Sequence, residues 1–271
     1  MLNVRKVASF AALGACIAIS TPSIADAQAL SRSPAEDGSW RHSITPYLFL
    51  PFSTKGTSTV DGSSVDLDLS LNEVLDILQG ALSVRYEGWN GDFGIVSELY
   101  YVKLGEDGTL PIGAGRTDVE VDVRQTFFNL QGAYRFANGV NASGRRYAAD
   151  AAIGVKWNRL KQEIDINTPG PSLSLGGTEE WFEPLITLRY ATEINDKWGF
   201  GARAELSGFG VNGDDLQYLV LAGFDWQGWE NTSLRFGYQF YGIDYSTDRD
   251  SGEFAYDVDQ NGIYAAVAFH F

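Results

Sequence analysis

Segments of about ten residues, in which apolar and polar side chains alternate, recur along most of the chain with turn residues between them. In LQYLVLAGFDW, residues 216–226, every second residue from Leu216 to Trp226 is apolar, and Gln217 and Asp225 lie on the intervening positions. A period of two puts successive side chains on opposite faces of a β-strand. The pattern therefore predicts strands with one apolar and one more polar face.

The alternation predicts ten strands. Their ranges are 40–52, 79–90, 93–104, 119–136, 146–164, 180–194, 197–209, 216–229, 233–245 and 256–271. Tight turns are expected at 90–92, 195–197 and 230–232, and long polar loops at 55–78, 105–116 and 168–177. An even number of strands, with short turns at one end and longer loops at the other, is typical of single-chain bacterial membrane barrels.

The composition of the two strand faces indicates which one meets lipid. In residues 234–242 the apolar face holds Phe236 and Tyr238, whereas the other face holds Arg235 and Gly237. A soluble sandwich would bury its large apolar residues and expose its charges to water, but here the charged face is rich in glycine and the apolar face in aromatic residues. This matches a barrel with apolar side chains toward lipid and polar ones toward the lumen. We therefore predict an all-β fold: a transmembrane antiparallel up-and-down β-barrel spanning residues 39–271.

The last expected strand carries its apolar residues on alternate positions, from Ile263 to the aromatic Phe271. It is expected to pair with the first strand, which closes the barrel and removes both sheet edges. An alternating last strand with a terminal aromatic resembles the signal that outer-membrane barrels present to the barrel-insertion machinery. Val267, Phe269 and Phe271 are the residues expected to form it.

The first residues have the pattern of an export signal. Arg5 and Lys6 precede a short apolar run, and an A-x-A cleavage pattern ends at Ala29. Residues 1–29 are therefore expected to be removed as a signal peptide, and residues 30–38 to form a short polar lead-in. An alternative is a lipoprotein signal with Cys16 as the lipidated residue, although the apolar run continues beyond that cysteine. Either signal indicates export, and the barrel pattern indicates the outer membrane of a Gram-negative cell.

Charge and cysteine content restrict the partners. The chain has a formal net charge of −15 and one cysteine, which lies in the expected signal. Nucleic-acid binding needs basic patches, so no nucleic-acid partner is expected, and no disulfide framework is expected either. The expected partners are outer-membrane lipid, lipopolysaccharide and the insertion machinery. The protein is expected to be a monomer with both termini in the periplasm.

Three short signatures are similar to those of a largely uncharacterised group of proteobacterial outer-membrane β-barrel proteins. They are WRHSITPYLFLP at 40–51, YAADAAIGVKW at 147–157 and EPLITLRY at 183–190. Glu183 stands where the third signature of the group has aspartate, which keeps a carboxylate at that position. The resemblance covers most of the mature chain and implies an outer-membrane barrel without an established activity.

Ten strands also resemble the omptin proteases in number, so enzymatic function must be considered. Outer-membrane proteases, phospholipases and lipid A deacylases generally use a histidine, and only His42 and His270 occur here. Both are expected at the periplasmic end, His42 facing the interface and His270 at the barrel rim, far from the external loops where surface chemistry takes place. No nucleophile elbow, phosphate loop or metal-binding Cys/His cluster occurs. We therefore expect no enzymatic activity, no cofactor and no metal site, and an outer-membrane hydrolase acting on lipid or peptide is the alternative.

The strongest polar constellation lies on the expected lumen face. It contains Arg85, Glu87, Glu98, Asp150, Lys156, Glu183, Arg189, Arg203, Glu205, Asp225 and Arg235. Such nearly balanced charges can pair across a small barrel, and interiors of about eight strands are just filled by side chains. A salt-bridged, mostly closed interior is favoured over a narrow polar channel, although a porin-like role stays open.

The first expected external loop contains a capping box, Ser70 to Glu73, followed by apolar residues at helical spacing. The pattern predicts a short helix whose apolar stripe is Leu71, Val74, Leu75 and Leu78. The helix could form a lid over the mouth, a plug or a lipid contact, or simply pack on neighbouring loops.

Carboxylates also gather at the expected outer strand ends, as Asp66, Asp68, Glu120, Asp122, Glu163 and Asp165. They favour a solvated acidic rim, with divalent cations bridging lipopolysaccharide as the alternative. The expected function is that of a structural or narrow porin-like barrel whose acidic mouth would favour cations. Another alternative is a surface adhesin or receptor acting through its loops.

Overall fold

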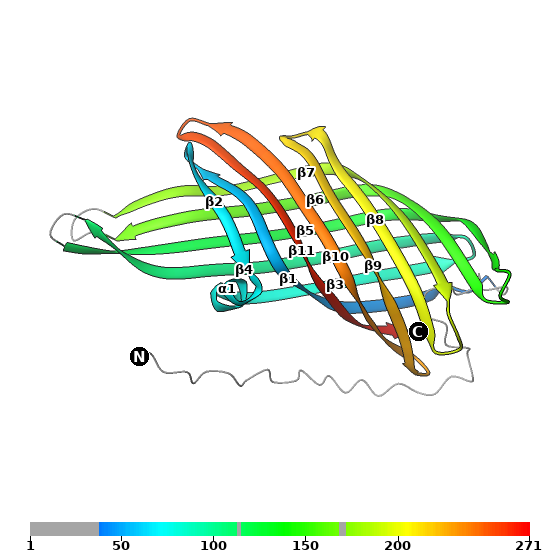
Figure 1. The fold of residues 1–271 in the computed structure, drawn as a ribbon. Helices are drawn as coiled ribbons and strands as arrows, with labels where there is room; N and C mark the ends of the chain where they lie inside the picture. Colours follow the sequence, from blue (N-terminus) through cyan, green and yellow to red (C-terminus); the bar gives the residue numbers. More distant parts are fainter. Residues whose placement is uncertain (1–37, 113–114, 168–171) are drawn as a thin grey trace, which may run out of the picture.

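The strands form one antiparallel sheet that closes on itself because β11 is hydrogen-bonded to β1 (Figure 1). The computed structural model describes residues 38–112, 115–167 and 172–271. Ten strands make up the closed wall, and β2 is an additional strand attached to β1. The ten-stranded barrel expected from the alternation is therefore confirmed. The expected signal segment 1–29 and residues 30–37 of the lead-in lie outside the described residues.

The elements follow the expected order with one addition, β2. They are β1 (Arg41–Val60), β2 (Ser63–Ser70), α1 (Leu71–Ile77), β3 (Leu78–Asn90), β4 (Phe93–Ile112), β5 (Gly115–Val140), β6 (Arg146–Asn167), β7 (Leu173–Glu193), β8 (Trp198–Val211), β9 (Asp214–Trp229), β10 (Thr232–Arg249) and β11 (Gly252–His270). No helix in the described part of the chain is long and apolar enough to cross a membrane.

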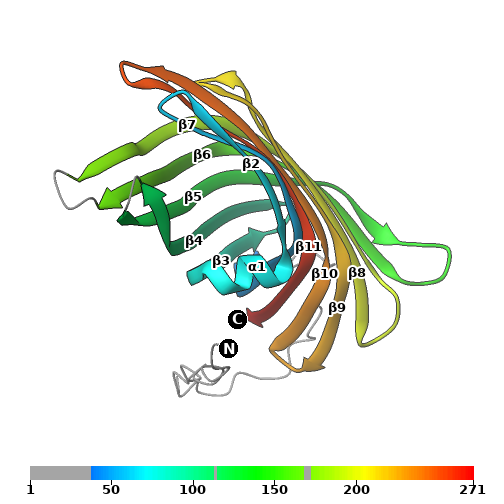
Figure 2. The same cartoon turned by 60° about the vertical axis from the view of Figure 1, so that its left-hand side comes forward.

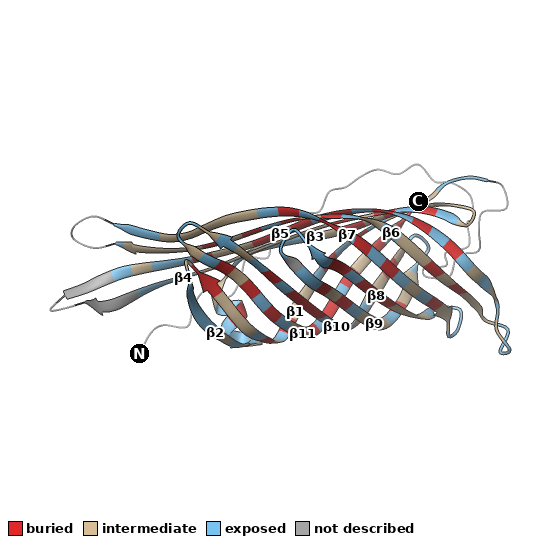
Figure 3. Ribbon diagram, turned by 90° about the horizontal axis from the view of Figure 1, so that it is seen from above, coloured by how far each residue is buried: buried red, intermediate tan, exposed pale blue. Residues whose placement is uncertain are grey.

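A belt of large apolar side chains surrounds the barrel. Buried and exposed residues alternate along the strands (Figure 3), and many of the exposed ones are apolar or aromatic. The belt includes Ile44, Leu48, Phe52, Leu82, Ile95, Phe128, Leu130, Tyr134, Ile153, Phe182, Ile186, Leu188, Leu206, Val220, Phe224, Phe236, Phe240, Ile263 and Phe269. Water would disfavour so much exposed apolar surface, whereas lipid stabilises it, and strand pairing around the wall satisfies most backbone groups in the hydrocarbon. The belt therefore identifies the membrane-spanning part of the barrel.

Several strands are much longer than the sequence predicts. β5 has 26 residues and β6 has 22, whereas about 9–11 residues suffice to cross a membrane. Most of the segments expected as loops, 105–116 and 168–177, continue the flanking strands, and residues 55–78 contain the end of β1, β2 and α1. The long-loop prediction was wrong because strand pairing continues beyond the lipid. We call the parts beyond the belt the outer extension: residues 53–60, 63–70, 103–112, 115–126, 159–167, 173–181, 207–211, 214–219, 241–249 and 252–259.

The apolar side chains change face where the strands leave the belt. On β10, Phe236 and Phe240 point outward and are exposed, whereas Tyr241 and Tyr245 point inward and are buried. Beyond the lipid the outer surface meets water, so polar residues are favoured there and apolar residues are favoured inside. The outer extension is therefore built like a soluble β-sandwich on top of a membrane barrel.

β1 changes partner along its length. Its first part, Arg41 to Pro46, pairs with β3, while Ser53 to Val60 pairs with β2, and β11 pairs with both parts. A register irregularity between Pro51 and Ser53 accompanies the change. Among the described residues, β2 pairs with β1 alone. α1 and β2 therefore lie at the gap between β1 on one side and β3 and β4 on the other (Figure 2).

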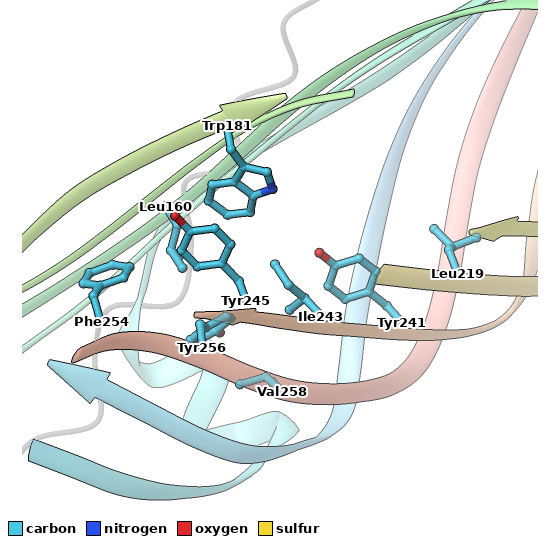
Figure 4. Close-up of a cluster of buried hydrophobic side chains, with 9 residues drawn as sticks. All are labelled: Leu160, Trp181, Leu219, Tyr241, Ile243, Tyr245, Phe254, Tyr256 and Val258. Carbon is cyan, nitrogen blue, oxygen red and sulfur yellow. The ribbon is translucent and has the colours of Figure 1, made fainter. Parts of the chain in front are cut away.

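A second separation lies between β7 and β8. These strands pair from Leu185 to Glu193 of β7, and within the described residues the preceding part of β7 pairs with β6 alone. The outer extension is thus divided into two facing sheets, one from β4 to β7 and one from β8 through β11 and β1 to β2. Their inward side chains form one apolar cluster (Figure 4): Leu160, Trp181, Leu219, Tyr241, Ile243, Tyr245, Phe254, Tyr256 and Val258.

Candidate functional site

The eleven residues expected in the lumen all point into the barrel and are largely buried. Nine of them are at most 8% exposed as whole residues, and the side chains of Arg189 and Arg235 are 15% and 14% exposed. Sequence reasoning missed a twelfth, Arg135 on β5, which is 6% exposed. The signal for it is present in the sequence, because Tyr134 and Phe136 on either side face outward.

The centre of the interior is a network of ion pairs. Arg85 on β3 lies 2.6 Å from Glu98 on β4 and 3.0 Å from Glu87, measured between nitrogen and oxygen. Arg203 on β8 reaches the same Glu98 oxygen at 2.9 Å, and Tyr47 on β1 donates its hydroxyl proton to the other oxygen at 2.5 Å. Glu205 lies 3.6 Å from Arg85 and 3.5 Å from Arg203. Glu98 is therefore held by three strands at once.

The network continues toward β5 and β6. Arg189 on β7 pairs with Glu87 at 2.5 Å and with Asp150 at 2.6 Å. The other Asp150 oxygen accepts a hydrogen bond from Arg135 Nε at 2.8 Å. Four arginines and four carboxylates thus form one connected group with no net charge. Charges in a low-dielectric interior are stable only when paired in this way.

Smaller polar groups lie on both sides of the network. Toward the chain ends, Arg235 pairs with Asp225 at 2.7 Å, and Ser233 connects Asp225 to His270. Toward the outer extension, Lys156 lies 3.7 Å from Glu183 and is hydrogen-bonded to Gln217. Every lumen charge predicted from the sequence is therefore in an ion pair.

A cavity of about 70 Å³ lies against the wall formed by β8, β9 and β10. Arg85, Arg189, Arg203 and Arg235 line it together with a row of glycines, Gly201, Gly223 and Gly237. The strands approach closely here: a Cβ on Gly223 would come within 2.3 Å of the Phe236 carbonyl oxygen. A cavity of this size accommodates a few water molecules.

The outer extension closes the interior above these charges. The apolar cluster fills the space between the two sheets, and Trp181 donates Nε1–H to Glu183 at 2.9 Å, which joins the cluster to the polar layer.

At the tip, the Asp61 carboxylate in the β1–β2 turn accepts hydrogen bonds from the Gly176 amide at 2.8 Å and the Ser251 hydroxyl at 2.6 Å. These bonds hold the pKa of Asp61 below its usual value. Arg249 adds an ion pair to Glu179 at 2.5 Å.

The short helix predicted after Ser70 is present as α1. Glu73 accepts hydrogen bonds from the Ser70 amide and hydroxyl, as expected for the capping box. Its stripe is divided: Val74 is buried, Leu75 is exposed, and Leu71 and Leu78 are half-buried. α1 contacts β1, β2 and β4, so it lies beside the separation in the wall. Its role as a lid stays a prediction.

The two histidines and the outer carboxylates complete the predicted residues. His42 lies at the barrel rim, hydrogen-bonded to Tyr86 and stacked on Phe271, while His270 points inward beside Ser233.

Of the outer carboxylates, Asp122 and Glu163 pair with neighbouring basic residues, Asp68 pairs with Lys55, and Asp165 accepts a hydrogen bond from Ser174. No group of three or more metal-ligating side chains occurs within the described ranges. Val267, Phe269 and Phe271 lie on the outward face of the barrel end.

Comparisons with known proteins give similarity of architecture alone. No protein-family model matches the chain, and no curated protein matches it. The outer membrane protease OmpT from Escherichia coli aligns with 86% of this chain and 96% of its own, at 9% identity and a TM-score of 0.43. The translocator domain of the autotransporter NalP from Neisseria meningitidis aligns with 86% and 89%, at 13% identity and a TM-score of 0.39. Ail, the attachment invasion locus protein of Yersinia pestis, aligns with 86% and 99%, at 10% identity and a TM-score of 0.36.

The apolar belt and the closed wall decide the location. The protein is an outer-membrane β-barrel. The start of β1 and the end of β11 lie at one end of the barrel, the end expected to face the periplasm, and the outer extension rises from the other.

Proposed function

We propose that the protein is a non-conducting structural barrel that anchors the outer extension in the outer membrane. The observation that carries this proposal is the presence of two consecutive layers across the interior. The first is the neutral network around Glu98 and Asp150, and the second is the apolar cluster around Trp181 and Tyr245.

The two layers oppose conduction for different reasons. A hydrated ion that enters the charged layer has to separate arginines from their carboxylates, and breaking a buried pair costs about 3–5 kcal/mol. In the next layer the same ion meets closely packed aromatic rings with few polar groups to replace its water, which is also unfavourable. Because the network carries no net charge, it also provides no attraction for ions of either sign.

A narrow porin-like channel is the second candidate. The cavity beside Gly223 supports it, since it shows that the inner half is not completely filled. Conduction along this route would require the two outer sheets to separate or α1 to leave its place between β2 and β4. The acidic residues of the outer extension would then favour cations.

Planar-bilayer recording of the refolded chain tests the proposal. Three proteins are compared: the wild-type chain, a variant lacking residues 71–78, and the double variant Trp181→Ala/Tyr245→Ala. Folding of each is verified by a heat-modifiable shift on gels. We expect no current from the wild-type chain or the deletion variant, and at most brief current steps from the double variant, which keeps the charged layer. Stable cation-selective steps from the wild-type chain would refute the closed barrel and support the channel.

An enzymatic function is less compatible with the positions of the histidines. A general base must lie within hydrogen-bond reach of its partner, and both His42 and His270 lie at the periplasmic end beside structural partners. Hydrolysis of labelled lipid and peptide by intact cells tests this alternative. An adhesin or receptor would use the surface of the outer extension, which whole-cell ligand binding tests.

A further inference from the structure

The outward face of β4 to β7 carries an ordered series of rows just beyond the apolar belt. Strand pairing places Leu99, Phe128, Trp157 and Phe182 side by side in the last row of the belt. The following outward row holds Tyr101, Thr126, Arg159 and Glu180. The row after that holds Lys103, Arg124, Lys161 and Thr178. Three basic residues on adjacent strands therefore lie two outward rows beyond the last row of the belt, after a row in which Arg159 and Glu180 form an ion pair.

The position of this row corresponds to lipid headgroups. Strands rise about 3.3 Å per residue and tilt relative to the membrane, so Lys103, Arg124 and Lys161 lie within about 10 Å of the end of the belt. Neighbouring strands are about 4.8 Å apart, which puts the three basic residues within one headgroup's width. Tyr101 and Trp157, between and below them, are residues of the kind that gather at membrane interfaces.

The basic side chains are accessible and held in place. The side chains of Lys103, Arg124 and Lys161 are 29%, 40% and 20% exposed. Asp122 pairs with Arg124 at 2.8 Å and with Lys103 at 3.4 Å, and Glu163 pairs with Lys161 at 2.6 Å. Both carboxylates lie in the next row, on the side away from the membrane, and the row beyond that holds Asp107, Glu120 and Asp165. The positive charge is therefore confined to the row of Lys103, Arg124 and Lys161.

The opposite side of the barrel carries acidic residues at a similar distance beyond the apolar belt. There Asp244 on β10 pairs in register with Asp257 on β11, and Tyr218 donates a hydrogen bond to Asp259 at 2.7 Å. Asp215 lies close enough to influence Asp244. The outer end of the belt is therefore basic on the β4–β6 side and acidic on the β9–β11 side, in a chain that is strongly acidic as a whole.

We propose that Lys103, Arg124 and Lys161 bind the phosphorylated headgroup of a glycolipid in the outer leaflet. The acyl chains of this lipid would lie on Leu99, Phe128, Trp157 and Phe182. A phosphate carries up to two negative charges and three acceptor oxygens, and a guanidinium with two flanking ammonium groups matches it in charge and in donors. Asp122 and Glu163 fix the three basic groups in one row just beyond the belt, where a bound phosphate would share them with the two carboxylates. The site does not depend on whether the barrel interior is closed.

The test compares lipids that differ only in phosphate. The refolded full chain is incorporated in phosphatidylcholine nanodiscs that contain either bisphosphorylated lipid A or its dephosphorylated form, and the lipid that co-purifies with the protein is quantified by mass spectrometry after detergent extraction. The site variant is Lys103→Gln/Arg124→Gln/Lys161→Gln. The control variant is Lys55→Gln/Arg145→Gln/Lys197→Gln, which removes the same charge from two exposed positions and one half-buried position elsewhere.

We expect the site variant to retain phosphorylated lipid A with about a hundredfold lower affinity, since each of the three basic residues at a membrane surface contributes about fivefold. The control variant should match the wild-type chain, and the dephosphorylated lipid should bind equally weakly to all three proteins. Equal retention of phosphorylated lipid by the site variant and the wild-type chain would refute the site. Equal retention of both lipids by the wild-type chain would refute recognition of phosphate. Heat-modifiable gel shifts establish that each variant is folded before lipid is measured.

Discussion

Trp181 on β7 and Tyr245 on β10 stack with their ring centroids 3.8 Å apart and their planes within 16°. The two strands are not neighbours in the sheet, and the contact joins the two facing sheets of the outer extension. Trp181 is 4% exposed and Tyr245 is 3% exposed. Beyond the wall separation at β7 and β8, side-chain packing of this kind keeps the sheets together in place of backbone pairing.

Replacement of Trp181 by alanine should destabilise the outer extension strongly. Removal of a buried large aromatic side chain typically costs about 3–5 kcal/mol, and this one also donates a hydrogen bond to Glu183. The measurement is the denaturant midpoint of the refolded chain, followed by circular dichroism. Trp229→Ala is the control, because Trp229 is 57% exposed and its loss should change the midpoint little. Equal effects of the two substitutions would contradict the packing argument.

Neutralising Glu98 should destabilise the barrel because two arginines would lose a shared partner. Glu98→Gln keeps the size of the side chain but leaves Arg85 and Arg203 with less negative charge, and breaking such a buried pair typically costs about 3–5 kcal/mol. The free energy of unfolding in detergent micelles measures the effect. The control is Lys55→Ala: this lysine pairs with Asp68 at 3.5 Å with both side chains mostly exposed, so a change under about 1 kcal/mol is expected.

The contact at the tip should weaken in acid. The hydroxyl of Ser251 and the amide of Gly176 lower the pKa of Asp61, so the carboxylate binds protons less tightly in the folded chain than in the unfolded one. Its contribution is therefore complete above the usual aspartate pKa and is lost as pH falls through the lowered pKa. Asp61→Asn should remove this dependence and cost about 1 kcal/mol at neutral pH. The rate of proteolysis at the tip, measured across a pH series, reports the stability of this contact. The assignment to Asp61 is refuted if the variant has the same acid dependence as the wild-type chain.

Asp244 should have the opposite pH dependence. Partial burial and the carboxylates of Asp257 and Asp215 raise its pKa above the usual value. The folded chain then binds the proton more tightly, so the stabilisation is present below the usual pKa and is lost as pH rises through the raised pKa. Asp244→Asn should therefore increase stability at neutral pH by a few tenths to about 1 kcal/mol. Thermal midpoints at two pH values test this, and a variant less stable than wild type at neutral pH would contradict it.

The membrane part of the fold follows closely from the sequence. Lipid outside and charges inside impose a strict alternation, so the alternation alone assigns residues such as Glu98, Asp150 and Asp225 to the interior. Which charges pair across the interior could not be predicted, because Arg189 on β7 meets Glu87 on β3, a strand far away in the chain. Arg135 obeys the same alternation, so its inward position is predictable on the same physical ground as that of the other lumen charges.

The outer extension was missed for a physical reason. Beyond the lipid both faces of a strand can carry polar residues, so segments such as 105–112 and 63–70 look like loops. One signal remains in the sequence. Apolar residues that face outward within the belt, such as Phe240 on β10 and Ile263 on β11, give way beyond the belt to apolar residues that face inward, such as Tyr241 and Val258. This change marks where each strand leaves the membrane, and it can be searched for in other barrel sequences.

The change of partner along β1 implies that the molecule contains two cooperative units. As far as Pro46, β1 is paired on both sides and the ring is closed, whereas from Tyr47 onward β1 separates from β3, and beyond Ser53 the wall is divided into two sheets joined by side chains. Local unfolding begins where the contacts are least stable. Amide hydrogen exchange should therefore proceed in two populations, with the amides of residues 53–60 exchanging together with β2 and well before those of residues 41–45. A protein that loses its extracellular part in this way would still be fully anchored.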